Sequence, residues 1–227
     1  MRTSSIIVLC IVIVIGGGIA WCKLAYPTYS YRYRMTVEVF VDGAVRSGSS
    51  VIEVQIHTQP NLLANPKVVP EVLGEAVFVD LGDGRNVIAL LASGTNGANV
   101  DYPSRLIPSL FDLTYDDRGL GELAQLRGSQ NLLEKNMPTL VTFADLTDPK
   151  SARIVQPLEF RKTFGPGVQF KRVGVELTDD AVTSGIEGKI PWIGNYAIEM
   201  EFERTLRASE HGQGPSMTPG MNLKRGR

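Results

Sequence analysis

Residues 31–41 read YRYRMTVEVFV, and this stretch decides the fold. Large apolar side chains occupy every second position, and charged or polar groups fill most of the positions between them. The apolar positions are Tyr31, Tyr33, Met35, Val37, Val39 and Val41. Because successive side chains of a strand point to opposite faces, the pattern predicts a half-buried β-strand. Asp42-Gly43 follows, a pair that tolerates the positive φ angles of a tight turn, and Val51–Thr58 alternates again, so we expect a hairpin.

Further along the chain, short apolar runs alternate with turn-forming residues. We expect further strands at residues 75–81, 85–92, 140–144, 170–178 and 196–202. Residues 106–114 favour a short helix or turn, and 121–127 a short helix. Together these patterns predict a mainly β domain, α+β at most. Its architecture is an antiparallel sandwich or half-open barrel with one or two short helices.

The N-terminal part has a different composition, because residues 3–22 carry no charged side chain. A helix of that length reaches about 30 Å, the thickness of the hydrocarbon core of a bilayer. We therefore expect four regions. They are an N-terminal flank at 1–5, a transmembrane anchor or signal segment at 6–22, a mainly β domain at 23–206 and a disordered basic tail at 207–227.

Three interpretations of the apolar segment compete, and a retained single-pass helix is preferred because Trp21 and Lys23 suit the far interface. A signal peptide cleaved after the small residues Gly18 and Ala20 is the alternative. Lipidation of Cys22 is disfavoured by the bulky Trp21. The basic flanks do not favour export, but charges inside a folded domain count less, so we expect an extracytoplasmic domain on the cytoplasmic membrane.

Charge and cysteine content exclude several classes of function. The 23 Lys and Arg residues nearly balance 24 Asp and Glu, giving a net charge of −1, so we expect no nucleic-acid partner. The only cysteines, Cys10 and Cys22, lie in or beside the apolar segment. The predicted β domain therefore has no disulfide, cysteine metal site or cysteine nucleophile.

Catalytic motifs are also missing from the sequence. His57 and His211 are the only histidines and fit no zinc-binding spacing. We therefore assign no catalytic, cofactor-binding or metal-binding residue. Asp145 with Asp148 and Asp179 with Asp180 are carboxylate pairs that could share a cation, although aspartates are equally common in turns.

Five segments carry a resemblance to known sequences. They are residues 31–39 (YRYRMTVEV), 47–54 (SGSSVIEV), 141–151 (VTFADLTDPKS), 164–167 (FGPG) and 176–180 (ELTDD). They resemble an uncharacterised family of bacterial proteins with an N-terminal hydrophobic segment. The resemblance implies membership and no particular activity, and it directs attention to polar stretches where function could lie. The candidate residues there are Ser47, Ser49, Ser50, Asp145, Asp148, Lys150, Asp179 and Asp180.

The preferred function is a single-pass membrane-anchored β domain that binds or scaffolds an envelope protein or polymer. One alternative is a carboxylate-dependent hydrolase of an envelope polymer, with or without a divalent cation. A cluster formed by Asp145, Asp148, Asp179 and Asp180 would favour the hydrolase, and dispersed turn positions would argue against it. A cytoplasm-facing membrane adaptor is the other alternative.

Overall fold

The computed structural model describes residues 27–59, 67–94, 96–123, 125–208 and 223–226. Within these ranges, no helix combines the length and the apolar character that crossing a bilayer requires. The expected flank at 1–5 and membrane segment at 6–22 lie outside the described residues.

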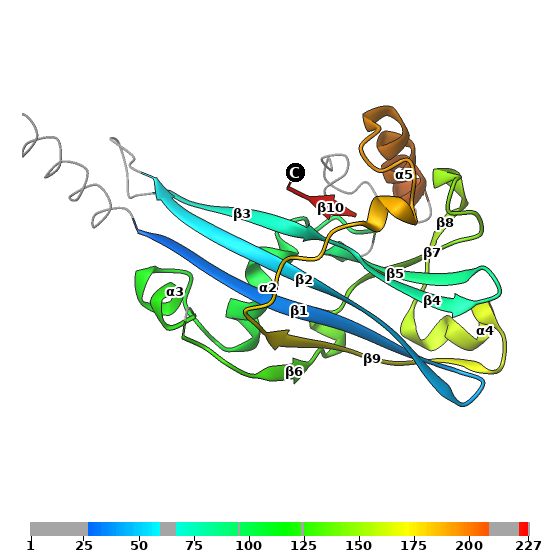
Figure 1. The fold of residues 1–227 in the computed structure, drawn as a ribbon, viewed down its shortest axis with the longest axis horizontal. Helices are drawn as coiled ribbons and strands as arrows, with labels where there is room; N and C mark the ends of the chain where they lie inside the picture. The colour runs from blue at the N-terminus through cyan, green and yellow to red at the C-terminus, as the bar shows by residue number, and fades with distance from the viewer. Residues whose placement is uncertain (1–26, 60–66, 95, 124, 209–222, 227) are drawn as a thin grey trace, which may run out of the picture. The chain divides into compact units, whose positions relative to one another are not determined.

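Two antiparallel sheets contain the ten strands of the described chain (Figure 1). The larger sheet has the order β10-β3-β2-β1-β9-β6. Its strands are β1 (Thr28–Val41), β2 (Ala44–Gln59), β3 (Lys67–Glu75), β6 (Ser129–Asn131), β9 (Val168–Leu177) and β10 (Lys224–Arg225). The smaller sheet has the order β4-β5-β7-β8. It contains β4 (Val77–Gly82), β5 (Arg85–Ser93), β7 (Pro138–Phe143) and β8 (Ala152–Ile154). The prediction of a mainly antiparallel β protein is confirmed.

Four short α-helices and four 3₁₀ turns accompany the sheets in the described ranges, more helices than the one or two expected. The helices are α2 (Tyr102–Leu110), α3 (Asp117–Leu123), α4 (Phe160–Phe164) and α5 (Tyr196–Ala208). The 3₁₀ turns are η1 (Glu134–Asn136), η2 (Pro149–Ser151), η3 (Pro157–Glu159) and η4 (Ile186–Gly188).

The strand predicted at 196–202 is wrong, because these residues begin helix α5. The buried positions of α5 are Glu199, Phe202, Glu203 and Leu206, which follow helical and not strand spacing. Two of the four are glutamates, so a search for apolar periodicity does not detect the buried face. The Glu199 carboxylate accepts a hydrogen bond from the Gly194 backbone N–H at 2.7 Å, which satisfies it close to the helix start.

The chain divides into two compact units, within each of which the backbone segments lie close together. The described residues of Met1–Ser30 and Gln55–Glu71 form the small unit, in which the Thr58 N–H donates to the Pro27 carbonyl. Tyr31–Val54 and the described residues of Val72–Arg227 form the large unit. Every site considered below lies in the large unit.

The alternation that predicted β1 is confirmed. Its apolar positions from Tyr31 to Val41 are at most 7% exposed, and the intervening residues are half-buried. Asp42 and Gly43 have φ angles of 50° and 85°, as the predicted hairpin turn requires. β1 therefore places one face in the core while its other face carries charged side chains.

A second part of the core lies between the smaller sheet and α5. Phe143 of β7, Trp192 and Phe202 of α5 form a triangle of rings with centroids 5.5 to 6.0 Å apart. The Trp192 indole N–H donates to the Leu146 carbonyl at 2.8 Å, so its polar atom is satisfied. These contacts fix α5 against β7.

The two sheets come very close at Gly48 of β2 and Phe78 of β4. A Cβ atom built on Gly48 would overlap the Phe78 carbonyl oxygen and lie 2.8 Å from its carbonyl carbon. Side chains of any size are excluded at this point, so the glycine is required by packing.

Of the tail predicted to be disordered at 207–227, the structure describes residues 207–208, which end helix α5, and residues 223–226. Leu223 is 1% exposed, and Lys224 and Arg225 pair with Glu75 and Gly74 of β3. The basic composition predicted a solvated end, whereas tertiary contacts bury part of it. Residues 209–222 and 227 lie outside the described residues.

Candidate functional site

Ser47, Ser49 and Ser50 are part of β2. Ser50 is 1% exposed, and its hydroxyl donates to the Glu75 carbonyl at 2.7 Å. Ser47 and Ser49 are exposed on either side of Gly48. Gly48 and Ser50 both make close packing contacts, so packing accounts for part of this polar stretch.

Asp145, Asp148 and Lys150 lie in the connection between β7 and β8, where Lys150 Nζ lies 3.5 Å from the Glu201 carboxylate of α5. The Asp145 carboxylate accepts from the backbone N–H and the hydroxyl of Thr147 at 2.8 and 2.7 Å, and these bonds lower its pKa. Asp148 accepts from the Lys150 backbone N–H at 2.9 Å. Both aspartates are thus committed to their own turn, the ordinary structural role of this residue type.

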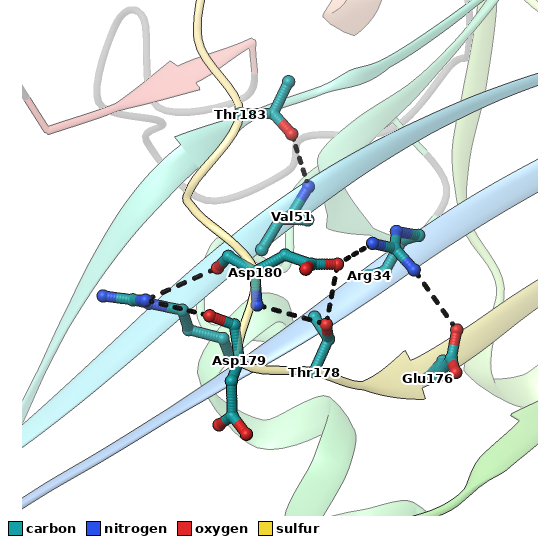
Figure 2. A network of polar contacts seen from close by, with 8 residues as sticks. Arg34, Val51, Glu176, Thr178, Asp179, Asp180 and Thr183 are labelled. Carbon is teal, nitrogen blue, oxygen red and sulfur yellow. Dashed lines mark hydrogen bonds and ion pairs between the residues drawn. The ribbon is translucent and has the colours of Figure 1, made fainter.

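Asp179 and Asp180 follow β9 and are paired with arginines of other elements. Figure 2 shows the Arg34 guanidinium between Asp180 and Glu176, and it donates to both carboxylates. Asp179 lies 3.3 Å from Arg127. Arg34 and Arg127 thus oppose three carboxylates, and these ion pairs anchor the chain after β9.

The same segment is also joined to β2. The Thr183 hydroxyl accepts from the Val51 N–H at 2.8 Å, and the Thr183 N–H donates to the Val51 carbonyl at 3.1 Å (Figure 2). Asp179 and Asp180 therefore have a structural explanation in the path of residues 178–183.

The four aspartates occupy two separate turns with different partners. Asp145 and Asp148 bond within their own loop, whereas Asp179 and Asp180 bond to arginines. In the part of the chain that the structure describes, no three His, Cys, Asp or Glu side chains are grouped as a metal site requires. The arrangement that would favour the hydrolase is not formed by these residues.

The candidate functional site is an open apolar pocket of about 580 Å³ with walls from both sheets. Its volume lies in the range of about 300–1,000 Å³ that is typical of ligand-binding pockets. Apolar side chains from β7, β8, β9 and the connecting turns line it. They include Leu132, Met137, Leu140, Ile154, Leu158 and Phe170.

Aromatic packing fixes one wall of this pocket. The Phe170 ring of β9 contacts the buried Phe160 ring of α4, with centroids 5.4 Å apart, and Phe160 in turn contacts Phe164 at 5.3 Å. At the opposite end, the Thr139 hydroxyl donates to the Gly94 carbonyl at 2.7 Å. The pocket is therefore formed by ordered groups without any ligand, which reduces the entropy that a ligand would lose on binding.

Two exposed leucines belong to the turns beside the pocket. Leu158, which lines it, is 98% exposed, and Leu133, next to the lining residues Leu132 and Glu134, is 68% exposed. Leu158 is held in η3, where the Glu159 N–H donates to the Gln156 carbonyl at 2.8 Å. Only two other large apolar side chains in the described chain are comparably exposed, Val45 and Tyr196. Two of the four exposed large apolar side chains of the described ranges thus lie at the pocket or next to it in sequence.

Sequence reasoning missed this site because its residues come from segments far apart in the chain. No local signal set Leu158 apart, because Ile154, Val155 and Phe160 lie near it in sequence as they would near a core leucine.

Comparison with known proteins adds no further assignment. No family model, curated protein or solved structure matches the chain.

Proposed function

We propose that this chain is a single-pass membrane-anchored β domain that binds another protein of the bacterial envelope through the apolar pocket. The observation that carries the proposal is Leu158, which is 98% exposed at an apolar pocket. Burying a leucine side chain is worth about 1.5–3 kcal/mol, so a partner that covers Leu158 gains that energy without reorganising the pocket.

The lining chemistry favours an apolar protein segment as the ligand. Six of the lining residues are Leu, Ile, Met or Phe, and the hydroxyl of Thr139 already donates within the domain. A sugar polymer needs several free hydrogen-bonding groups in its binding site. One or two large apolar side chains of a partner protein need only an apolar pocket of sufficient volume, which this domain has. Protein binding also fits Leu133 and Leu158 as exposed contacts on the rim.

The membrane location rests on residues 6–22 and on the resemblance to the bacterial family. A segment without charge from 3 to 22 is long enough to span a bilayer as a helix. The described sheets fit a sandwich in which Gly48 and Phe78 bring the two layers together. With the domain outside the cytoplasmic membrane, the partner belongs to the envelope. A cytoplasm-facing adaptor would use the same pocket for a different partner.

Site-specific photo-crosslinking in cells tests the binding surface. A photoreactive amino acid is placed at Leu158 of the full chain, and the matched control carries it at Tyr196, which is 67% exposed on α5 and does not line the pocket. We expect a discrete protein adduct from position 158 and none from position 196. Equal labelling from both positions, or no adduct from 158, would refute the proposed surface.

The partner found in this way is then titrated against purified full-length variants. Leu158→Ala should weaken binding by about 10- to 100-fold, the loss expected when most of one buried leucine side chain is removed. Its unfolding midpoint should match that of the wild type, because the side chain makes almost no contact in the free protein. An alkaline phosphatase fusion after residue 227 separately tests the predicted orientation, since the enzyme is active only outside the cytoplasm.

A further inference from the structure

We propose that the edge of β3 on which β10 lies is a receptor for the segment Leu223-Lys224-Arg225-Gly226, here called the strap, and that two copies of this chain pair by exchanging their straps. This surface is separate from the apolar pocket, so the inference goes beyond the proposed function. It rests on how specifically each strap residue is held.

Backbone pairing sets the register of the strap. Lys224 lies opposite Glu75 and Arg225 opposite Gly74 in an antiparallel ladder, and the Ala76 N–H donates to the Leu223 carbonyl at 2.8 Å. This is strand addition to a sheet edge, a recurring mode of peptide recognition.

Two side chains of the strap give the edge its selectivity. Leu223 is 1% exposed and packs in the core cluster that contains Trp192 and Phe202. Lys224 Nζ lies 2.8 Å from the Glu187 carboxylate. An apolar side chain followed by a cation is therefore recognised at fixed positions.

Arg225 reaches deepest into the domain. Its guanidinium donates to the Leu91 carbonyl at 3.1 Å and to the Val100 carbonyl, and burial lowers its pKa. The positive charge of Arg225 is thus stabilised by backbone carbonyls of β5 and of the loop that follows it. A neutral residue at this position would leave those contacts unmade.

The strap is small compared with the core that it covers. β10 pairs over two residues, so its release exposes the β3 edge without removing any other strand of the described sheets. An exposed strand edge readily accepts another chain. A second copy carries the same four residues and satisfies every contact in trans that the first copy makes in cis, which is the basis of domain swapping.

The position of the strap in the sequence permits the exchange. Residues 209–222 connect α5 to Leu223, and a connection of this length can reach about 45–50 Å when extended. Binding in cis benefits from an effective concentration in the millimolar range. Exchange should therefore become prominent at protein concentrations near about 1 mM, or where a membrane confines the chains.

Zero-length crosslinking tests the exchange on the full chain. Unlabelled and ¹⁵N-labelled proteins are mixed at about 1 mM and treated with a carbodiimide, which joins the Lys224 amine to the Glu187 carboxylate 2.8 Å away. We expect crosslinked peptides in which Lys224 comes from one isotopic form and Glu187 from the other. Their share should fall at least tenfold when the proteins are mixed at about 10 µM.

The controls separate exchange from chance encounters. Glu187→Gln removes the crosslink, and an excess of a synthetic peptide of residues 221–227 should suppress the mixed product by occupying the β3 edge. Crosslinks that join only chains of the same isotopic form would show that the strap stays in cis and would overturn the inference. Mixed products that the peptide does not reduce, or no Lys224–Glu187 crosslink at all, would overturn it as well.

Discussion

Replacement of Gly48 by alanine should destabilise the domain strongly, although the change adds a single methyl group. Gly48 has no positive φ angle, so the backbone itself tolerates alanine. The cost arises from the opposite sheet, where the new Cβ would overlap the Phe78 carbonyl oxygen. It would also lie 2.8 Å from the Phe78 carbonyl carbon and 3.3 Å from Val79 Cγ2.

The size of the destabilisation follows from how far β2 and β4 must move to make room for the new methyl group. Ordinary contacts of a Cβ begin near 3.4 Å, so β2 and β4 must separate by more than half an ångström or tilt. Phe78 pairs with Ile88 of β5, which is fully buried, so a displacement is passed to the centre of the smaller sheet. Overpacking of this kind costs about 1–3 kcal/mol, and the rigid neighbours favour the upper end. For a protein of this size, about 3 kcal/mol corresponds to a melting temperature lower by about 6–12 °C.

The assay is thermal unfolding followed by near-ultraviolet circular dichroism, with Gly121→Ala as the matched control. Gly121 lies in α3 with no atom within 4 Å of an added Cβ, so its replacement should be neutral or stabilising by about 0.5–1 kcal/mol. If Gly48→Ala melts as high as the wild type while the control behaves as expected, the two sheets do not approach closely at this point.

Two further substitutions test other parts of the structure. Asn86→Ala should lower the free energy of unfolding in urea by about 3 kcal/mol or more. The reason is that Asn86 accepts a hydrogen bond from the Phe143 N–H and donates one to the Phe143 carbonyl, both at 2.9 Å in the core. An unchanged unfolding midpoint would contradict these two bonds. Glu38→Gln should cost about 1 kcal/mol at pH 7, discounted for solvent screening, because Arg172 and then Lys171 lower the Glu38 pKa from 4.5 to about 2. Since the folded-state pKa of Glu38 is lower than its ordinary value, this stabilisation is present above about pH 4.5 and disappears as the pH falls to 2. The unfolding curves of the wild type and of Glu38→Gln should therefore converge near pH 2. A constant difference in stability between pH 7 and pH 2 would show that the ion pairs are not its source.

Local periodicity predicted the elements whose burial is set by their own residues. β1 alternates along its length, and its buried positions match the apolar ones. Helix α5 was mistaken for a strand because two of its buried positions are the glutamates Glu199 and Glu203. Apolar periodicity cannot detect a face that contains charged residues with internal partners.

Tertiary contacts explain the rest of what the sequence did not predict. Arg225 looks like part of a solvated basic end until the carbonyls of Leu91 and Val100 are placed beside it. Leu158 looks like an ordinary core residue until its turn is found at the surface. The candidate aspartates lie in the segments that follow β7 and β9, and the hydrolase alternative depended on how close these two segments come, which sequence alone does not decide.

The pairing of β1 with β9 has a consequence for how the chain folds during synthesis. Glu38 and Arg172 face each other across these two strands and are separated by 134 residues in sequence. Contacts between such distant residues form slowly, because a long loop must close before the pairing stabilises it. While the ribosome makes the residues after β2, the edge of β1 that pairs with β9 has no partner strand, and this nascent chain is prone to aggregate. We expect the growing polypeptide to depend on a chaperone until residue 177 has been made.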